Sequence, residues 1–120
     1  MSREQPVKIV KKKIKPYPIE AVLEANALKK TVEIMYLTAQ GAVVRLGTQM
    51  VFVGEYYQTQ FQIPVMRESI RSQCRIIRTF DRAVDPKNGV VERLAEFHFQ
   101  NLTPEHKERI VSFTKAIGQA

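Results

Sequence analysis

The sequence YLTAQGAVV, residues 36–44, indicates how this chain folds. It has the pattern of a β-strand that ends in a Thr38-x-x-Gly41 turn and restarts as a second strand at Ala42. Glycine can supply the positive φ that a tight turn requires, and Gly41 is expected to do so here. Upstream of this pattern, the segment KKKIK, residues 11–15, places a basic arm before the first strand of the same domain.

Size and charge restrict the class of protein. A chain of 120 residues with 44% hydrophobic and 26% charged residues predicts one globular domain with its own core. The formal net charge of +7, from 19 Lys and Arg against 12 Asp and Glu, favours an anionic partner. Cys74 is the single cysteine, which excludes an internal disulfide. Since no apolar run approaches the ~20 residues of a membrane span and no signal peptide pattern is present, we expect a cytoplasmic protein without a membrane partner.

Period-two alternation of apolar and polar side chains predicts strands along most of the chain. In one of them, Val32, Ile34 and Tyr36 are expected on the same face. In residues 57–63, inward-facing side chains alternate with three glutamines. The predicted strands are residues 31–37, 42–46, 57–63, 70–80 and 90–99, with residues 50–53 as a further short apolar run that ends at Gly54.

The segment of residues 19–30 is ambiguous. Its Ala, Leu, Glu and Lys content favours a helix on intrinsic propensity. The alternation of Ile19, Ala21 and Leu23 with polar neighbours also permits a half-buried strand, followed by a turn at Asn26. Local chemistry alone favours the helix.

The C-terminal segment is predicted to be helical over residues 104–118. Thr103 can cap this helix, Pro104 suits its first position, and Glu105 favours the positive end of the helix dipole. A stripe of apolar residues at helical spacing follows, with Gly118 as a stop. The stripe is His106, Ile110, Phe113 and Ile117, with Val111 and Ala116 beside it.

The expected organisation is a basic N-terminal arm followed by a single domain. Residues 1–15 are expected to form the flexible arm, and residues 16–120 the domain. Residues 85–89, DPKNG, give the strongest turn signal and connect two long strands as a hairpin. Several short strands and one amphipathic helix predict a mainly β protein, a small barrel with the helix packed on it.

Known catalytic patterns are missing from the sequence. His98 and His106 are the only histidines, and neither has the spacing of a metal site. The sequence contains no P-loop and no Gly-x-Gly-x-x-Gly motif. Glu92 and Glu96 are assigned to an outward strand face, where solvation explains their charge. Cys74 is expected to be a small core residue on an apolar strand face. We therefore expect no enzyme, no metal and no cofactor.

The basic arm and the Thr-x-x-Gly turn together resemble those of the PilZ domain family. That family carries an Arg-x-x-x-Arg arm before its first strand and an Asp/Asn-x-Ser-x-x-Gly turn. Here the arm positions are Lys11 and Lys15, and the turn reads Tyr36-x-Thr38-x-x-Gly41. The resemblance implies a six-stranded antiparallel PilZ-like β-barrel with a C-terminal α-helix, and it assigns residues 19–30 to the first strand. It also implies a regulatory module in bacterial second-messenger signalling that binds cyclic di-GMP and relays this to an unidentified protein partner. The implied ligand-binding residues are Lys11, Lys12, Lys15, Tyr36, Thr38 and Gly41.

The substitutions in both motifs predict weak binding. Lysine attracts phosphate as a point charge but lacks the planar fork with which arginine pairs to phosphate and guanine. Tyr36 stands where a small carboxylate or amide is expected, and packing in the core or at its rim is favoured for it over ligand contact. An alternative therefore stays open: an adaptor that acts through protein contacts and does not bind cyclic di-GMP.

A second alternative is a small basic barrel that binds nucleic acid. Arg67, Arg71 and Arg75 recur at four-residue steps and predict a basic stripe on one strand face. Barrels that bind single strands usually interleave aromatic residues for base stacking, whereas Gln73 separates Arg71 from Arg75 here. Nucleic acid is accordingly the least favoured partner.

Overall fold

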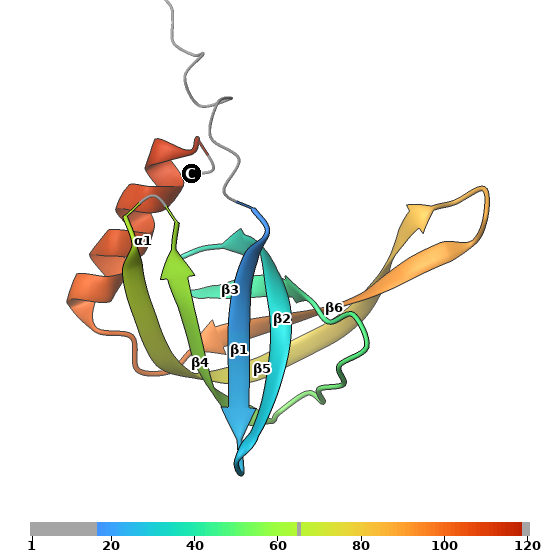
Figure 1. The fold of residues 1–120 in the computed structure, drawn as a ribbon, viewed down its shortest axis with the longest axis horizontal. Helices are drawn as coiled ribbons and strands as arrows, with labels where there is room; N and C mark the ends of the chain where they lie inside the picture. Colours follow the sequence, from blue (N-terminus) through green and yellow to red (C-terminus); the bar gives the residue numbers. More distant parts are fainter. Residues whose placement is uncertain (1–16, 65, 119–120) are drawn as a thin grey trace, which may run out of the picture.

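The computed structural model describes residues 17–64 and 66–118, in which the chain forms a closed antiparallel β-barrel. Around the barrel the strands follow the order β1-β2-β3-β6-β5-β4, so that β1 closes against β4 (Figure 1). The predicted six-stranded barrel with a C-terminal helix is confirmed. The elements are β1 (Ile19–Ala25), β2 (Leu28–Leu37), β3 (Gly41–Arg45), β4 (Tyr56–Ile63), β5 (Glu68–Asp85), β6 (Val90–Phe99) and α1 (Pro104–Ala116).

The ambiguous segment of residues 19–30 is two strands joined by a tight turn. Asn26 and Ala27 form the turn, with φ of 52° and 67°. Positive φ at both central residues is typical of the hairpin turns whose twist matches that of the flanking strands. The helix that local propensity favours is therefore absent from this segment, because pairing on both sides of β1, with β2 and with β4, outweighs a weak local preference.

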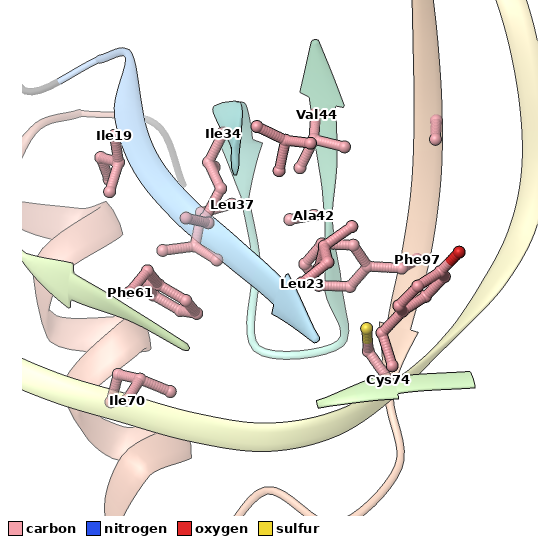
Figure 2. Close-up of a cluster of buried hydrophobic side chains, with 14 of the residues drawn as sticks. Ile19, Leu23, Ile34, Leu37, Ala42, Val44, Phe61, Ile70, Cys74 and Phe97 are labelled. Carbon is pink, nitrogen blue, oxygen red and sulfur yellow. The ribbon is translucent and has the colours of Figure 1, made fainter. Parts of the chain in front are cut away.

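The core fills the inside of the barrel with one face of every strand (Figure 2). The predicted inward face of β4 is confirmed, since Phe61 and Ile63 are buried while the glutamines that alternate with the inward-facing residues are exposed. The inward face of β5 is confirmed as well, and Cys74 is fully buried there. Thr59 is also fully buried, and its hydroxyl has no hydrogen-bond partner among the described residues.

Helix α1 packs beside the barrel and begins as predicted. The Thr103 side chain accepts a hydrogen bond from the backbone N–H of His106, and Ile110 and Phe113 are fully buried. The Phe113 ring meets Tyr17 edge to face, with centroids 6.2 Å apart. The helix ends at Ala116, two residues before the predicted end, and Val111 is exposed.

Strand β5 is longer than predicted and forms a projecting hairpin with β6. The predicted strand ends at Phe80, but β5 continues to Asp85. Beyond the barrel the two strands pair only with each other and extend away from it (Figure 1). Val84, Val90 and Val91 are exposed on this arm. The turn predicted at residues 85–89 lies at its tip.

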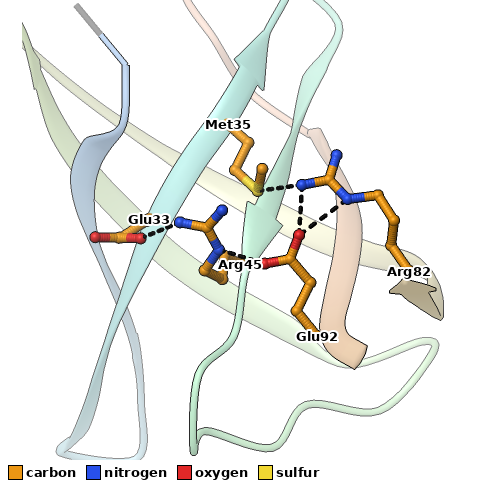
Figure 3. A network of polar contacts seen from close by, with 5 residues as sticks. All are labelled: Glu33, Met35, Arg45, Arg82 and Glu92. Atoms are coloured by element: carbon orange, nitrogen blue, oxygen red, sulfur yellow. Dashed lines mark hydrogen bonds and ion pairs between the residues drawn. The ribbon is translucent and has the colours of Figure 1, made fainter. Parts of the chain in front are cut away.

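A chain of ion pairs joins the base of this hairpin to the outer face of β2 and β3 (Figure 3). Arg45 lies between two carboxylates, donating to Glu92 at 2.6 Å and to Glu33 at 2.8 Å. Arg82 approaches the second oxygen of Glu92 from β5. The hydrogen bond from Arg45, with that from Arg82, lowers the pKa of Glu92 below its ordinary value. The carboxylate is thus ionised wherever the protein is folded near neutral pH.

The short apolar run at residues 50–53 is not a strand. It lies in the connection between β3 and β4, where Val51 is buried but Met50, Phe52 and Val53 are exposed. No sheet partner holds the backbone of this run among the described residues. Instead, Lys30 donates to the Met50 carbonyl, and Glu55 bonds the Phe52 backbone through both its carboxylate and its own N–H.

Candidate ligand-binding site

A β-bulge in β2 aims Tyr36 away from the core. Pairing with β3 shifts register between Ile34 and Tyr36. The alternation therefore changes phase, so that Leu37 is fully buried while Tyr36 is 51% exposed. The expectation that Tyr36 shares a face with Val32 and Ile34 is wrong for this reason. Bulges often re-aim side chains in this way next to functional sites.

Thr38 shapes the turn that follows. Its hydroxyl oxygen accepts from the backbone N–H groups of Gln40 at 3.1 Å and Gly41 at 3.2 Å. The hydroxyl also lies 3.3 Å from the Gly41 carbonyl, to which it can donate. The Thr38 hydroxyl therefore makes hydrogen bonds within its own turn, and a ligand would have to compete with these bonds.

Gly41 is needed for close strand approach. A Cβ at this position would lie 2.0 Å from the carbonyl oxygen of Phe97 and 3.0 Å from the Cα of His98. Its φ is outside the left-handed region, which corrects the expectation that it supplies a positive φ. The glycine allows β3 to lie against β6, where Gly41 pairs with His98.

A pocket of about 230 Å³ opens beside this turn. Tyr36 and Thr38 of the turn motif line it together with two residues of β6, Glu96 and His98. Alternation along residues 90–99 assigns both β6 residues to a solvated face. No local signal in the sequence joins them to the turn, because the contact depends on β3 and β6 being neighbours in the barrel although they are distant in the sequence. The pocket is lined by Tyr36, Thr38, Gln40, Gly41, Ala42, Val43, Glu96 and His98.

Glu96 gives this pocket a negative charge. Its carboxylate accepts from Arg78 Nε at 2.7 Å and lies 2.9 Å from His98 Nε2. The bond from Arg78 is the main cause of a lowered Glu96 pKa, and the contact with His98 adds to it. A second register shift, between Ile76 and Arg78, keeps Arg78 on the outside, where it pairs with Glu96. The pocket thus presents an ionised acceptor to any ligand that carries N–H donors.

The basic residues of the predicted site, Lys11, Lys12 and Lys15, lie outside the described residues. Of the predicted set, the structure therefore brings together Tyr36, Thr38 and Gly41. Their assignment as ligand contacts stays a prediction.

Two features restrict the chemistry available to the described residues. Burial raises the pKa of the Cys74 thiol to about 12, so that it is protonated and inaccessible as a nucleophile. Among residues 17–64 and 66–118, no group of three or more His, Cys, Asp or Glu side chains is arranged to hold a metal ion. In the same part of the chain, no helix has the length and apolar character needed to cross a membrane.

The strand order, the Thr38-x-x-Gly41 turn and the terminal helix define a PilZ-like fold. The PilZ domain with c-di-GMP of YcgR from Escherichia coli is similar, with a TM-score of 0.71 and 15% identity over 84% of this chain and 82% of that chain. The Bacillus subtilis inhibitor of motility, MotI/DgrA, is similar with a TM-score of 0.67 and 15% identity, over 82% of this chain and 46% of that chain. No family model and no curated protein matches the sequence. The structural similarity thus establishes the fold.

Proposed function

We propose that this protein is a non-enzymatic PilZ-type regulatory module that binds cyclic di-GMP weakly in the pocket between β2, β3 and β6. The observation that carries the proposal is the pocket beside the Thr38-x-x-Gly41 turn of a PilZ-like barrel. A similar barrel, the E. coli YcgR domain, was solved with this ligand.

Glu96 supports recognition of guanine in this proposal. The Watson–Crick edge of guanine presents adjacent N–H donors, which suit a carboxylate. An ionised carboxylate offers about four acceptor sites, and Arg78 and His98 occupy two of them. Glu96 on β6 would thus take the role of the Asp or Asn that the PilZ turn motif has at the position of Tyr36. The half-exposed Tyr36 ring offers a face for stacking, worth about 1–3 kcal/mol per base in single-strand binders.

The size of the pocket limits what enters it. At about 230 Å³ it is smaller than the roughly 300–1,000 Å³ of sites that enclose drug-sized ligands. We therefore place one guanine in the pocket and the phosphates outside it, and we propose that Lys11 and Lys15 bind the phosphates. Each bidentate arginine contact that lysine replaces costs about 1–3 kcal/mol, so two such losses weaken binding by a factor between about 30 and about 10⁴.

The ligand would regulate binding of a partner protein if it contacted the pocket and the basic segment at the same time. A ligand held by both fixes the segment against the barrel and changes the surface offered to a partner protein. Such a shift requires that the ligand bind the closed arrangement better than the open one. The partner is not identified by any residue pattern in the chain.

Calorimetric titration with cyclic di-GMP tests the proposal. We expect saturable binding in the high micromolar range, lost in the double variant Lys11→Ala, Lys15→Ala and about tenfold weaker in Glu96→Gln. Lys87→Ala, at the tip of the hairpin, is the matched control and should bind normally. Lys11→Arg and Lys15→Arg combined with Tyr36→Asp should strengthen binding.

The second candidate is an adaptor that does not bind the dinucleotide. The engaged hydroxyl of Thr38 and the bulky Tyr36 favour it, since the turn then has a structural role alone. The absence of any heat or saturable signal at high micromolar cyclic di-GMP, in wild type and in the arginine-restored variant, would establish this candidate over the first.

A further inference from the structure

A large surface depression lies on the half of the barrel that faces away from the β2–β3–β6 pocket. It is a groove of about 1,090 Å³ over the outer faces of β1, β4 and β5. In the barrel order, these three strands are consecutive, and of the other three strands only β2 contributes to the lining, through Lys29 (Figure 1). A ligand in the pocket therefore leaves the groove open.

The floor of the groove is a row of amides. Gln58, Gln60 and Gln62 alternate along β4 with buried residues, so that all three side chains point outward. No hydrogen-bond partner for these side chains occurs within residues 17–64 and 66–118. An amide side chain offers two donors and a carbonyl acceptor. The floor can thus pair with another polar chain in either direction.

The basic wall of the groove contains arginines that have no carboxylate partner among residues 17–64 and 66–118. The described part of the chain has eight arginines, and five of them form ion pairs. The three without an ion pair in this part are Arg67, Arg71 and Arg75, all on the β5 side. Arg67 and Arg71 line the groove, whereas Arg75 lies over the Tyr56 ring, 5.9 Å from its centroid.

The opposite wall is acidic. Glu20 and Glu24 project from β1, with Lys29 across from Glu24 on β2. The walls are separated by β4, since Arg71 pairs with Gln60 and Gln60 pairs with β1. Two strand spacings make this separation about 10 Å. The width matches an extended polypeptide, whose side chains alternate between two sides.

We propose that this groove docks an extended segment of a partner protein that carries acidic side chains toward β5 and basic side chains toward β1. Opposite charges on the two walls disfavour a nucleic acid, because a polyanion is attracted by one wall and repelled by the other. The groove also lacks the aromatic series that stacks bases, since the one aromatic residue in its lining, Phe61, is buried in the core and Tyr56 lies beyond the lining. A closed barrel offers no edge for strand addition here, so recognition is by side chains.

Two synthetic peptides of equal composition provide the probe. An alternating (Glu-Lys)₆ peptide presents its two charges on opposite sides when extended, whereas a Glu₆Lys₆ block peptide does not. A twelve-residue oligothymidylate is the nucleic-acid probe. Binding is measured by fluorescence anisotropy at low salt, and the contact surface by chemical-shift changes in ¹⁵N-labelled protein.

We expect the alternating peptide to bind at least about fivefold more tightly than the block peptide and to shift the side-chain amides of Gln58, Gln60 and Gln62. Arg71→Glu should weaken it about fivefold or more, while Lys87→Glu should change it little. Any of three results would overturn the proposal: equal affinity for both peptides, higher affinity for the oligothymidylate, or an affinity for the alternating peptide that Arg71→Glu does not change. Cyclic di-GMP titration of Arg71→Glu separates the two sites, since loss of groove binding leaves the nucleotide pocket unchanged.

Discussion

Replacing Gly41 by alanine tests how closely β3 and β6 approach. The added Cβ would lie 2.0 Å from the Phe97 carbonyl oxygen, whereas ordinary contacts begin near 3.4 Å. The backbone of β6 must therefore move by more than 1 Å at this point. The severe overlap, with the Phe97 carbonyl oxygen, is with a main-chain atom of a closed sheet, so no side-chain rotation relieves it.

The cost can be estimated from overpacking in well-packed interiors, which ranges over about 1–3 kcal/mol and is at times larger. A clash against main chain falls at the upper end, so we expect about 3 kcal/mol for Gly41→Ala. At about 4 °C per kcal/mol for a domain of this size, the melting temperature should fall by about 12 °C.

Gly47→Ala is the matched control for this experiment. Gly47 has a φ of +61°, and apart from its chain neighbours no described residue has an atom within 4 Å of the place that an added Cβ would take, so its substitution costs only backbone strain. That strain is about 1–2 kcal/mol. Urea unfolding followed by circular dichroism measures both variants. If Gly41→Ala were no more destabilising than Gly47→Ala, the inferred close approach of the two strands would be refuted.

Three further predictions concern buried and charged groups. Thr59→Val should stabilise the protein by about 1 kcal/mol in urea unfolding, because it removes a buried hydroxyl that has no hydrogen-bond partner among the described residues. A loss of stability would instead show that the hydroxyl does have a hydrogen-bond partner in the folded protein. The Cys74 thiol, with its pKa raised to about 12 by burial, should resist a thiol-reactive dye in the native protein and react only after denaturation. Glu92→Gln should lower stability by about 1 kcal/mol at pH 7, a figure reduced for the exposure of its arginine partners. The folded pKa of Glu92 is lowered, so this difference should be present above the unfolded value of about 4.3 and disappear as the pH falls through the folded pKa. A difference that instead grows on acidification would contradict the assignment.

The sequence predicts those features that depend on local alternation. Residues 57–63 form a strand with the predicted inward face, because successive side chains of a strand point to opposite faces whatever its neighbours are. Thr103 is recognisable as a helix cap for the same kind of local reason. Residues 19–30 need the family resemblance, since their propensity favours a helix that pairing within the barrel excludes.

The candidate site can be predicted only in part. A bulge changes the phase of a strand by one residue and has no clear local signature, so alternation places Tyr36 on the wrong face. The role of Gly41 depends on the backbone of β6, and that of Glu96 on lying opposite Val43. These contacts arise from strand order, which alternation along a single chain does not encode.

The projecting β5–β6 hairpin has a practical consequence for studying this protein. Its tip lies at the end of an arm that leaves the barrel, and the side chain of Lys87 there is exposed. Loop tips of this kind tolerate insertions and chemical labels well. A fluorophore or an epitope tag attached at the tip would therefore report on binding at either half of the barrel while touching neither.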